Sequence, residues 1–302
     1  KMIRIGTCSW PEKSMIQSGG FYPGEARSAE ERLRYYAGKF NTVEVDSSYY
    51  AIPSVKNAQL WAERTPENFL FHIKVYGTLT GHGIDPKSLP ADLAATLPQQ
   101  EESKKYIYIK RPEVLRIIAE RFVETLTPLK RAKKLGMIIF QYPPWFRYGS
   151  AELEYILSNR EWIQGYPMAV EFRHGSWLAP DKAETVFRFL QEHGITYIAA
   201  DEPQYGSPVT IPFLPEVTTE IAYFRLHGRN KENWLKKGIE TSLRYDYFYS
   251  DDELRSFIPA IRGVAERASR TFVMFNNCHG ASAFKNALRL GELLSEASHG
   301  AG

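Results

Sequence analysis

The sequence of 302 residues contains only two cysteines, Cys8 and Cys278. Two thiols are too few for a disulfide-rich scaffold or a cysteine-based zinc module, so both classes are excluded. The chain also lacks any apolar run near the roughly 20 residues that a membrane-spanning helix needs. Its first residues, KMIRIG, carry no apolar signal region. We therefore expect a cytoplasmic protein with no membrane partner and with free thiols.

Several familiar short motifs are also missing. The sequence has no phosphate-binding loop, no dinucleotide-binding glycine fingerprint and no H-E-x-x-H zinc motif. Its formal net charge of +3 is too small to indicate nucleic-acid binding by itself. Function therefore has to be inferred from where polar residues fall within the predicted fold.

What the chain does contain is a regular alternation of short apolar runs and amphipathic stretches, which is typical of repeated βα units. Eight parallel strands without a break in composition favour a single α/β domain, a (β/α)8 TIM-like barrel over residues 1–302. An open doubly wound sheet would give a similar pattern. The predicted strands are 3–8, 42–46, 70–75, 137–141, 168–172, 196–200, 222–227 and 271–275.

The connecting segments carry further signals. The longest predicted helix, 113–136, contains Pro128, which is expected to interrupt it. In a barrel, the loops that follow the carboxyl ends of the strands build the active site. The segment 77–110 is long enough to be a lid-like insertion over that end. We expect the tail, 295–302, to be frayed.

Four predicted strands alternate apolar side chains with charged or polar ones. Successive side chains of a strand point to opposite faces, so each strand has an apolar face and a polar face. The apolar faces must meet the helices, which directs the polar faces into the barrel, where branched apolar residues are usual. The polar set comprises Glu44, Asp46, His72, Lys74, Glu171, Arg173, Arg225 and His227.

Two interpretations of this polar set are open. The residues could be internal ion pairs that only close the barrel, for example between Glu44 and Arg225. Buried ion pairs are a poor source of stability because desolvation opposes their attraction. Since most of these residues lie at strand ends, we favour a ligand site at the carboxyl-terminal mouth. Glu44 and His72, which lie two positions deeper, are expected to be structural.

The ligand-site hypothesis assigns roles by residue type. The candidate acid and base groups are Glu171, His227 and Asp46. The candidate cations for binding negative charge are Lys74, Arg173 and Arg225. Other polar or aromatic residues near strand ends are expected to bind and orient the substrate: Gln141, Tyr49, Trp177, Asp201, Asn276 and Asn277. No cofactor is predicted; a divalent metal is possible, although no local spacing specifies a site for one.

Several motifs together resemble a known family. In order along the chain they are GTCSW, TVEVDSSYYAIP, FHIKVYG, FQYPPWF, VEFRHGSW, FRLHGRN and FNNCHG. They are similar to the YecE-like family, which is catalogued as a domain of unknown function, and the similarity extends from about Ile3 to Leu294. The resemblance implies a TIM-barrel-like fold with these residues at the mouth, and it implies no particular reaction. The segment 77–110 resembles an insertion in one branch of the family.

Two function hypotheses follow from these observations. We favour an enzyme that uses acid/base chemistry on a small phosphorylated or sugar-like anionic substrate. The alternative is a nucleic-acid-binding protein that resembles barrel endonucleases acting on damaged DNA. It depends on the loop 229–249, where Lys and Arg are interleaved with aromatic residues, although a solvated basic loop has the same composition. The sequence leaves the substrate and the oligomeric state open.

Overall fold

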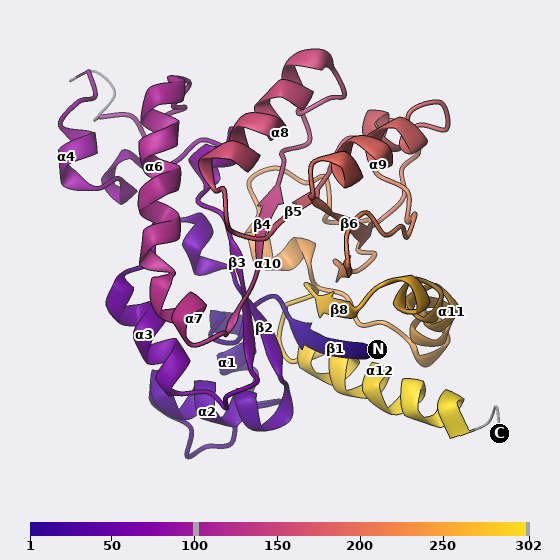
Figure 1. Ribbon diagram of the computed structural model, residues 1–302. Helices are drawn as coiled ribbons and strands as arrows, with labels where there is room; N and C mark the ends of the chain where they lie inside the picture. Colours follow the sequence, from indigo (N-terminus) through magenta and orange to yellow (C-terminus); the bar gives the residue numbers. More distant parts are fainter. Residues whose placement is uncertain (99–102, 300–302) are drawn as a thin grey trace.

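The computed structural model describes residues 1–98 and 103–299. Its eight strands form a closed parallel barrel in which each strand pairs with the next and β8 pairs with β1 (Figure 1). The predicted (β/α)8 barrel is therefore confirmed, and every strand lies within two residues of its predicted bounds. The strands are β1 Met2–Thr7, β2 Thr42–Val45, β3 Leu70–Lys74, β4 Leu135–Gln141, β5 Met168–Glu171, β6 Thr196–Asp201, β7 Ile221–Leu226 and β8 Arg270–Phe275.

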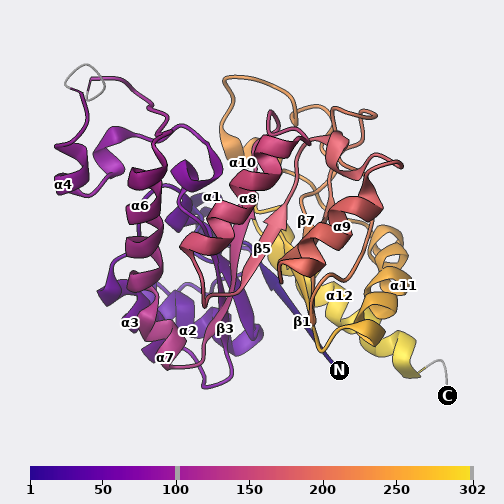
Figure 2. The same cartoon turned by 45° about the horizontal axis from the view of Figure 1, so that its top comes forward.

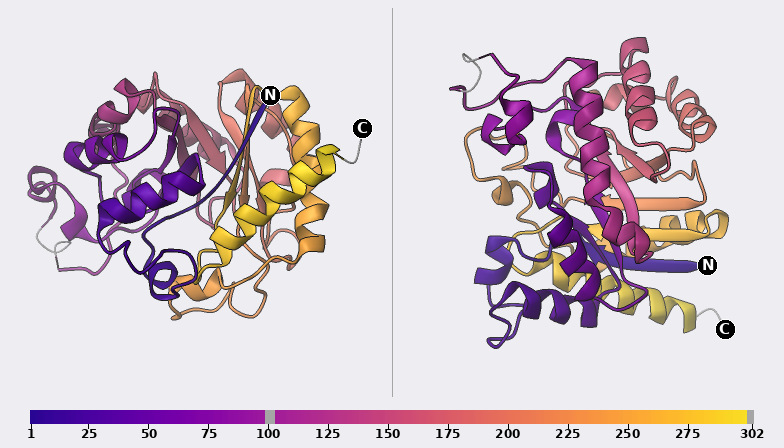
Figure 3. Two further views of the ribbon diagram at one scale, coloured as in Figure 1. Left: turned by 90° about the horizontal axis from the view of Figure 1, so that it is seen from below. Right: turned by 60° about the vertical axis from the view of Figure 1, so that its left-hand side comes forward.

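Helices cover the outside of the barrel and pack on the apolar faces of the strands (Figure 3). The longer ones are α2 Ala29–Lys39, α3 Val55–Glu63, α6 Pro112–Thr125, α8 Ser150–Trp162, α9 Ala183–Glu192, α11 Asp251–Arg267 and α12 Ser282–His299. The shorter ones are α1 Lys13–Gln17, α4 Ala91–Ala94, α7 Thr127–Arg131 and α10 Thr241–Arg244, with 3₁₀ turns η1 Ser47–Tyr49, η2 Gly77–Thr80, η3 Pro86–Ser88 and η4 Gly175–Leu178.

Local signals explain two of the helix boundaries. The predicted helix over 113–136 is interrupted at Pro128, which lies in the first turn of α7, just after α6 ends. Proline is tolerated there because the first N–H groups of a helix have no partner inside the helix. Ser250 and Glu253 form a capping box that starts α11. At the other end of the chain, α12 continues to His299, and 300–302 lie outside the described residues, so fraying of the tail 295–302 stays a prediction.

The segment 77–110, predicted to be a lid, packs at the side of the barrel. The carbonyl oxygen of Leu79 accepts hydrogen bonds from Tyr155 and Asn159 of α8, which fixes the start of the segment. Further along, α4 lies beside α6 at the edge of the molecule in Figures 1 and 3, and Asp92 is paired with Arg121. Residues 99–102 lie outside the described part of the chain. A lid role for this segment stays a prediction.

A different connection lies over the carboxyl ends of the strands. The segment between β7 and α11 carries α10, which is at the top of the molecule in Figure 2, on the side opposite the amino terminus. This segment includes the loop 229–249 that the sequence marks as basic and aromatic. Among the helices of the described residues, none is both long and apolar enough to cross a membrane.

Gly6 provides a test of how closely β1 and β2 approach. A Cβ atom at Gly6 would lie 2.3 Å from the backbone oxygen of Thr42, which cannot rotate away. We expect Gly6→Ala to lower the free energy of unfolding by about 1–3 kcal/mol, measured by urea denaturation. In the control Gly38→Ala, within α2, the added methyl meets no atom within 4 Å and should be neutral or stabilising. Equal stabilities for the two variants would contradict this packing.

Candidate functional site

Arg225 of β7 is fully buried at the centre of the barrel. Its Nε and Nη2 donate to the two carboxylate oxygens of Glu44, at 3.1 and 2.9 Å. Its Nη1 donates to Oε1 of Gln141 at 2.7 Å and to Oε1 of Glu171 at 3.3 Å. Since β2 and β7 are not neighbours in the barrel, the contact with Glu44 must cross the interior. The polar faces therefore point inward, as predicted.

Glu171 of β5 is the second centre of this buried cluster. It accepts hydrogen bonds from Arg173 Nε at 2.8 Å, His227 Nε2 at 2.9 Å and Arg225 Nη1. Burial alone would raise the pKa of Glu171, but the contacts with His227, Arg225 and Arg173 hold it well below its usual range. The carboxylates of Glu171 and Glu44 are thus balanced by two guanidinium groups.

The imidazole of His227 connects this cluster to the mouth. Its Nδ1 lies 2.8 Å from Nδ2 of Asn276, just beyond β8. With the amide nitrogen as donor, Nδ1 is the acceptor and Nε2 carries the hydrogen that Glu171 accepts. Burial lowers the pKa of His227 to about 3, so the ring is neutral. Asn276 itself lines a cavity at the mouth.

Two aromatic rings from the loop after β7 cover the cluster. The rings of Trp234 and Tyr245 lie 6.0 and 6.1 Å from that of His227, and they meet each other edge to face at 5.7 Å. The guanidinium of Arg173 lies 5.2 Å from the Trp234 ring. Glu171 and His227, predicted to face an open chamber, are instead sealed beneath these rings, with no exposed surface.

An open cavity of about 310 Å³ lies beside Tyr245 at the carboxyl ends of β1, β2, β3 and β8. On its wall, Lys74 Nζ is 3.4 Å from Asp46 Oδ1, and the Asp46 side chain is 38% exposed. Lys74 also lies 4.5 Å from the ring of Tyr49. The remaining lining residues are mostly polar and include Ser9, Glu12, Glu240, Thr241, Ser242 and Asn276.

Both cysteines also line this cavity. The thiols of Cys8 and Cys278 are free, as expected, and both are buried. Burial raises the pKa of Cys8 well above its ordinary value and raises that of Cys278 as well. Protonated thiols are poor nucleophiles, so we assign neither cysteine a chemical role.

Comparisons with known proteins identify the family. The sequence matches the family described as "Protein of unknown function DUF72" over residues 4–301. The chain belongs to this DUF72 family. It is 31% identical to UPF0759 protein YunF of Bacillus subtilis over 297 residues, which cover 97% of this chain and 95% of YunF. It is 25% identical to UPF0759 protein YecE of Escherichia coli K12 over 202 residues, covering 66% of this chain and 59% of YecE. The predicted YecE-like membership is confirmed.

Solved structures of DUF72 proteins agree with the fold. A family member from Enterococcus faecalis superposes with a TM-score of 0.78 at 29% identity, covering 97% of this chain and 96% of that one. One from Thermotoga maritima gives 0.77 at 31% identity, covering 98% and 100%. The family description and these relatives name no substrate, so the chemistry rests on the site itself.

Asp201, a predicted substrate-binding residue, is bonded within the protein at the end of β6. Its carboxylate accepts hydrogen bonds from Arg229, with Nη2 at 2.9 Å, and from Tyr249 Oη at 2.7 Å. Its neighbour Glu202 faces the mouth instead, and its Oε2 lies 3.9 Å from Arg173 Nη1. The three residues of β6 before Asp201 are the apolar Ile198, Ala199 and Ala200, and Glu202 lies beyond the strand, so alternation gave no signal for Glu202.

Two other predicted substrate-binding residues are also part of the packing. The Trp177 ring is fully buried and stacks on Phe172 at 4.2 Å and on Phe146 at 5.5 Å. Asn277 is fully buried and donates to Asn286 Oδ1 at 2.9 Å. Both positions are close to strand ends, but their side chains point into the layer between barrel and helices.

His72 and Glu44 lie where a structural role was expected. His72 is fully buried, with Nε2 2.9 Å from Thr42 Oγ1 and Nδ1 accepting from the Met137 N–H at 2.9 Å. Burial lowers the pKa of His72 to about 3. Within residues 1–98 and 103–299, no three His, Cys, Asp or Glu side chains are grouped so that they could hold a metal ion.

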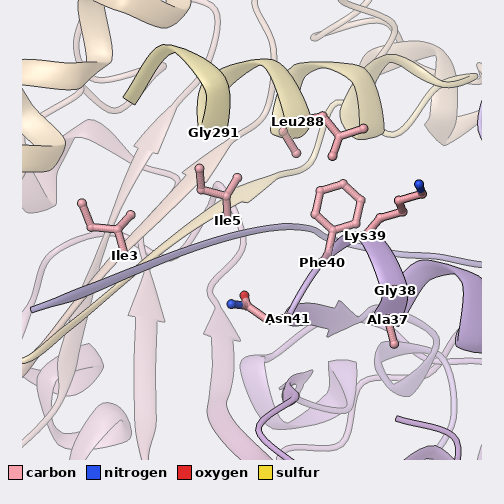
Figure 4. Close-up of a pocket in the computed structure, with 10 residues that line it drawn as sticks. Ile3, Ile5, Ala37, Gly38, Lys39, Phe40, Asn41, Leu288 and Gly291 are labelled. Carbon is pink, nitrogen blue, oxygen red and sulfur yellow. The ribbon is translucent and has the colours of Figure 1, made fainter. Parts of the chain in front are cut away.

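Another cavity, of about 400 Å³, lies on the outer wall between α2, β1 and α12. Figure 4 shows Ile5 and Phe40 beneath α12, on which Gly291 and Leu288 are labelled. Lys39 supplies the charge of this lining, which is otherwise apolar or neutral. With no acid/base pair in its lining, this cavity is a weaker candidate for chemistry than the mouth.

The buried cluster predicts a large effect on stability when one charge is removed. In Glu44→Gln, the two buried guanidinium groups would face one carboxylate, and we expect a loss of about 3–5 kcal/mol in the free energy of unfolding, measured by urea denaturation. In the control Glu30→Gln, which removes an exposed pair with Arg34 on α2, the change should stay below about 1 kcal/mol. A similarly small change in both variants would contradict the cluster's importance.

The raised pKa of Glu202 predicts how the free energy of unfolding changes with pH. Burial raises the pKa of Glu202 from 4.5 to about 7, so the folded state binds a proton that the unfolded state has already lost. This group therefore removes stability as pH rises from about 5 to 8, by about 3 kcal/mol. Glu202→Gln should lack that loss, so its stability relative to the wild type should rise over this range. A difference that is constant with pH would contradict the assignment.

Proposed function

We propose that this protein is an enzyme that uses acid/base groups at the barrel mouth on a small, sugar-like substrate with an anionic group. One observation carries the proposal: Asp46 and Lys74, 3.4 Å apart, face a cavity of about 310 Å³ at the carboxyl ends of the strands. Barrel enzymes have their active sites at this end. The pair combines a proton-transferring group with a cation next to it.

Asp46 is the catalytic acid/base group of this proposal, because it is partly exposed in the cavity. Lys74, only 14% exposed, would stabilise negative charge that develops on the substrate. The hydroxyl groups of Ser9, Thr241 and Ser242 in the same lining suit a substrate with several hydroxyl groups of its own. Hydrolysis, elimination and isomerisation are all accessible to such a pair.

Glu171 and His227 act in this proposal as positioning residues. Both are fully buried, and the low pKa of Glu171 makes it a weak base. The hydrogen bonds from Asn276 to His227 and from His227 to Glu171 fix the Asn276 amide at the cavity wall. A fixed amide orients a substrate without having to reorganise during the reaction.

The alternative, nucleic-acid binding through the loop 229–249, lacks an observation of comparable strength. Arg229 is paired with Asp201 and Glu253, and Lys236 is paired with Glu232. Arg244 donates to the backbone oxygen of Lys236. Several cations of the loop are thus bonded within the protein. Saturable binding to short DNA or RNA that weakens steeply with salt would revive this alternative.

The test is a screen of neutral sugars, polyols and sugar phosphates for thermal stabilisation, followed by turnover of the compounds that bind. We expect Asp46→Asn to reduce kcat about 10²–10⁴-fold while the substrate still binds, because the acid/base group is lost and the shape is kept. Lys74→Met should reduce both kcat and affinity. Full turnover by Asp46→Asn would contradict the assignment.

Matched controls separate a chemical effect from a general effect of charge. Asp252→Asn removes a carboxylate from α11 that is 96% exposed, and Lys56→Met removes an exposed cation from α3. Neither residue lines the Asp46–Lys74 cavity, so kcat and affinity should equal those of the wild type. Urea denaturation of each variant checks that the folded state is retained.

A further inference from the structure

A second, smaller cavity is also lined by Tyr245. It has a volume of about 120 Å³, equivalent to about four water molecules. Arg173, Glu202, Trp234 and Arg244 line it together with Tyr245, which also lines the Asp46–Lys74 cavity. Tyr245 therefore borders two cavities at the mouth.

Each arginine that lines the smaller cavity has a guanidinium nitrogen without a hydrogen-bond acceptor among the described residues. Nε of Arg244 is buried and has no hydrogen-bond partner within the described part of the chain, while its Nη2 is anchored at 2.7 Å to the Lys236 backbone oxygen. Arg173 is anchored through Nε to Glu171 and through Nη2 to Gln141. Its Nη1 lies 3.9 Å from Glu202, which is beyond hydrogen-bond distance.

An unpartnered buried donor is unfavourable unless a ligand or water satisfies it. Here two guanidinium groups, each held by other bonds, offer unused donors to one small cavity. Guanidinium groups bind oxyanions such as phosphate, sulfate and carboxylate through paired N–H groups. The stacking of Arg173 near Trp234 holds that guanidinium in place without using its hydrogens.

We propose that the Arg173–Arg244 cavity is an anion subsite that takes a tetrahedral oxyanion group, phosphate or sulfate, from a small ligand. It is distinct from the Asp46–Lys74 cavity, where Asp46, Glu12 and Glu240 outnumber the one cation and disfavour an anion. This subsite rests on the proposed function and adds to it a binding site for the anionic group of the substrate. The substrate's anionic group would bind in the smaller cavity and its hydroxyl-bearing part in the Asp46–Lys74 cavity.

Glu202 fits this assignment when it is protonated. Its Oε1 accepts the Ile211 N–H at 2.7 Å, and burial raises its pKa to about 7, with the carboxylates of Glu171 and Asp201 adding to the effect of burial. A neutral carboxyl next to Arg173 leaves the guanidinium charge available to the ligand. The protonated group can also donate a hydrogen bond to an oxyanion.

Sulfate alone is the probe for the subsite, since it keeps its charge near neutral pH and carries no sugar-like part. We expect saturable binding to the wild-type protein, followed by Trp fluorescence and by the rise in Tm with sulfate concentration at constant ionic strength. Arg244→Gln should weaken binding at least about tenfold, because it removes the unused Nε donor and the charge. Lys237→Gln, an exposed cation of the same loop, should bind as the wild type does.

Two results would overturn the subsite: no saturable sulfate binding by the wild type, or equal affinity in wild type and Arg244→Gln. If Arg244→Gln proves too unstable to compare, Arg244→Lys keeps the charge but removes the guanidinium, and it should also bind sulfate more weakly. The proposed function fails separately. If sulfate binds through Arg244 but no sugar-like compound is turned over, the subsite is supported and the proposed reaction is rejected. If a sugar-like compound is turned over but Arg244→Gln binds sulfate as tightly as the wild type, the reaction is supported and the subsite is rejected.

Discussion

The guanidinium of Arg225 sets the constraint on which the rest of the barrel interior depends. A buried cation must be neutralised and must have its N–H groups satisfied, and here the partners come from β2, β4 and β5. Arg173 then balances the second carboxylate, Glu171. The four charges of Glu44, Glu171, Arg173 and Arg225, on β2, β7 and the end of β5, thus satisfy one another. Their geometry is fixed because moving any one of them would leave an unpaired charge in a medium of low polarity.

This balance determines where chemistry is possible at the mouth. A carboxylate that already accepts bonds from three side chains is stabilised as an anion and is reluctant to take a proton, so Glu171 is better suited to holding other groups in place. The groups whose charge or N–H donors are not fully used within the cluster lie closer to the mouth. Asp46 and Lys74 face the larger cavity, while Arg173 and Arg244 have unused N–H groups at the smaller one. The buried cluster acts as a rigid base for these groups.

The sequence predicted the buried charged cluster well because one simple rule, the alternation of side chains along a strand, places its residues. Alternation in β2, β5 and β7 places Glu44, Glu171 and Arg225 on inward faces, and closure of the barrel brings them together. The rule fails beyond the strand ends and in β6, whose middle residues Ile198, Ala199 and Ala200 are apolar on both faces. Asp201 and Glu202 are adjacent in sequence but have different partners, Arg229 for Asp201 and Arg173 for Glu202, and only the folded chain distinguishes them. Likewise, the positions of Trp234 and Tyr245 depend on a long loop whose path no periodicity specifies.

Tyr245 contacts both the cavities at the mouth and the buried cluster, because it lines both cavities and its ring lies near that of His227. Its contacts with Trp234 and His227 are ring contacts at 5.7 and 6.1 Å, which permit small shifts at little energetic cost. A ligand that fills one cavity must contact this ring, and a ligand that fills both must displace it or pass beside it. Arg244 directly precedes Tyr245 in the chain, and its guanidinium is held by the Lys236 backbone oxygen. A ligand that fills both cavities would therefore contact one continuous part of the loop 229–249, above the buried charged cluster.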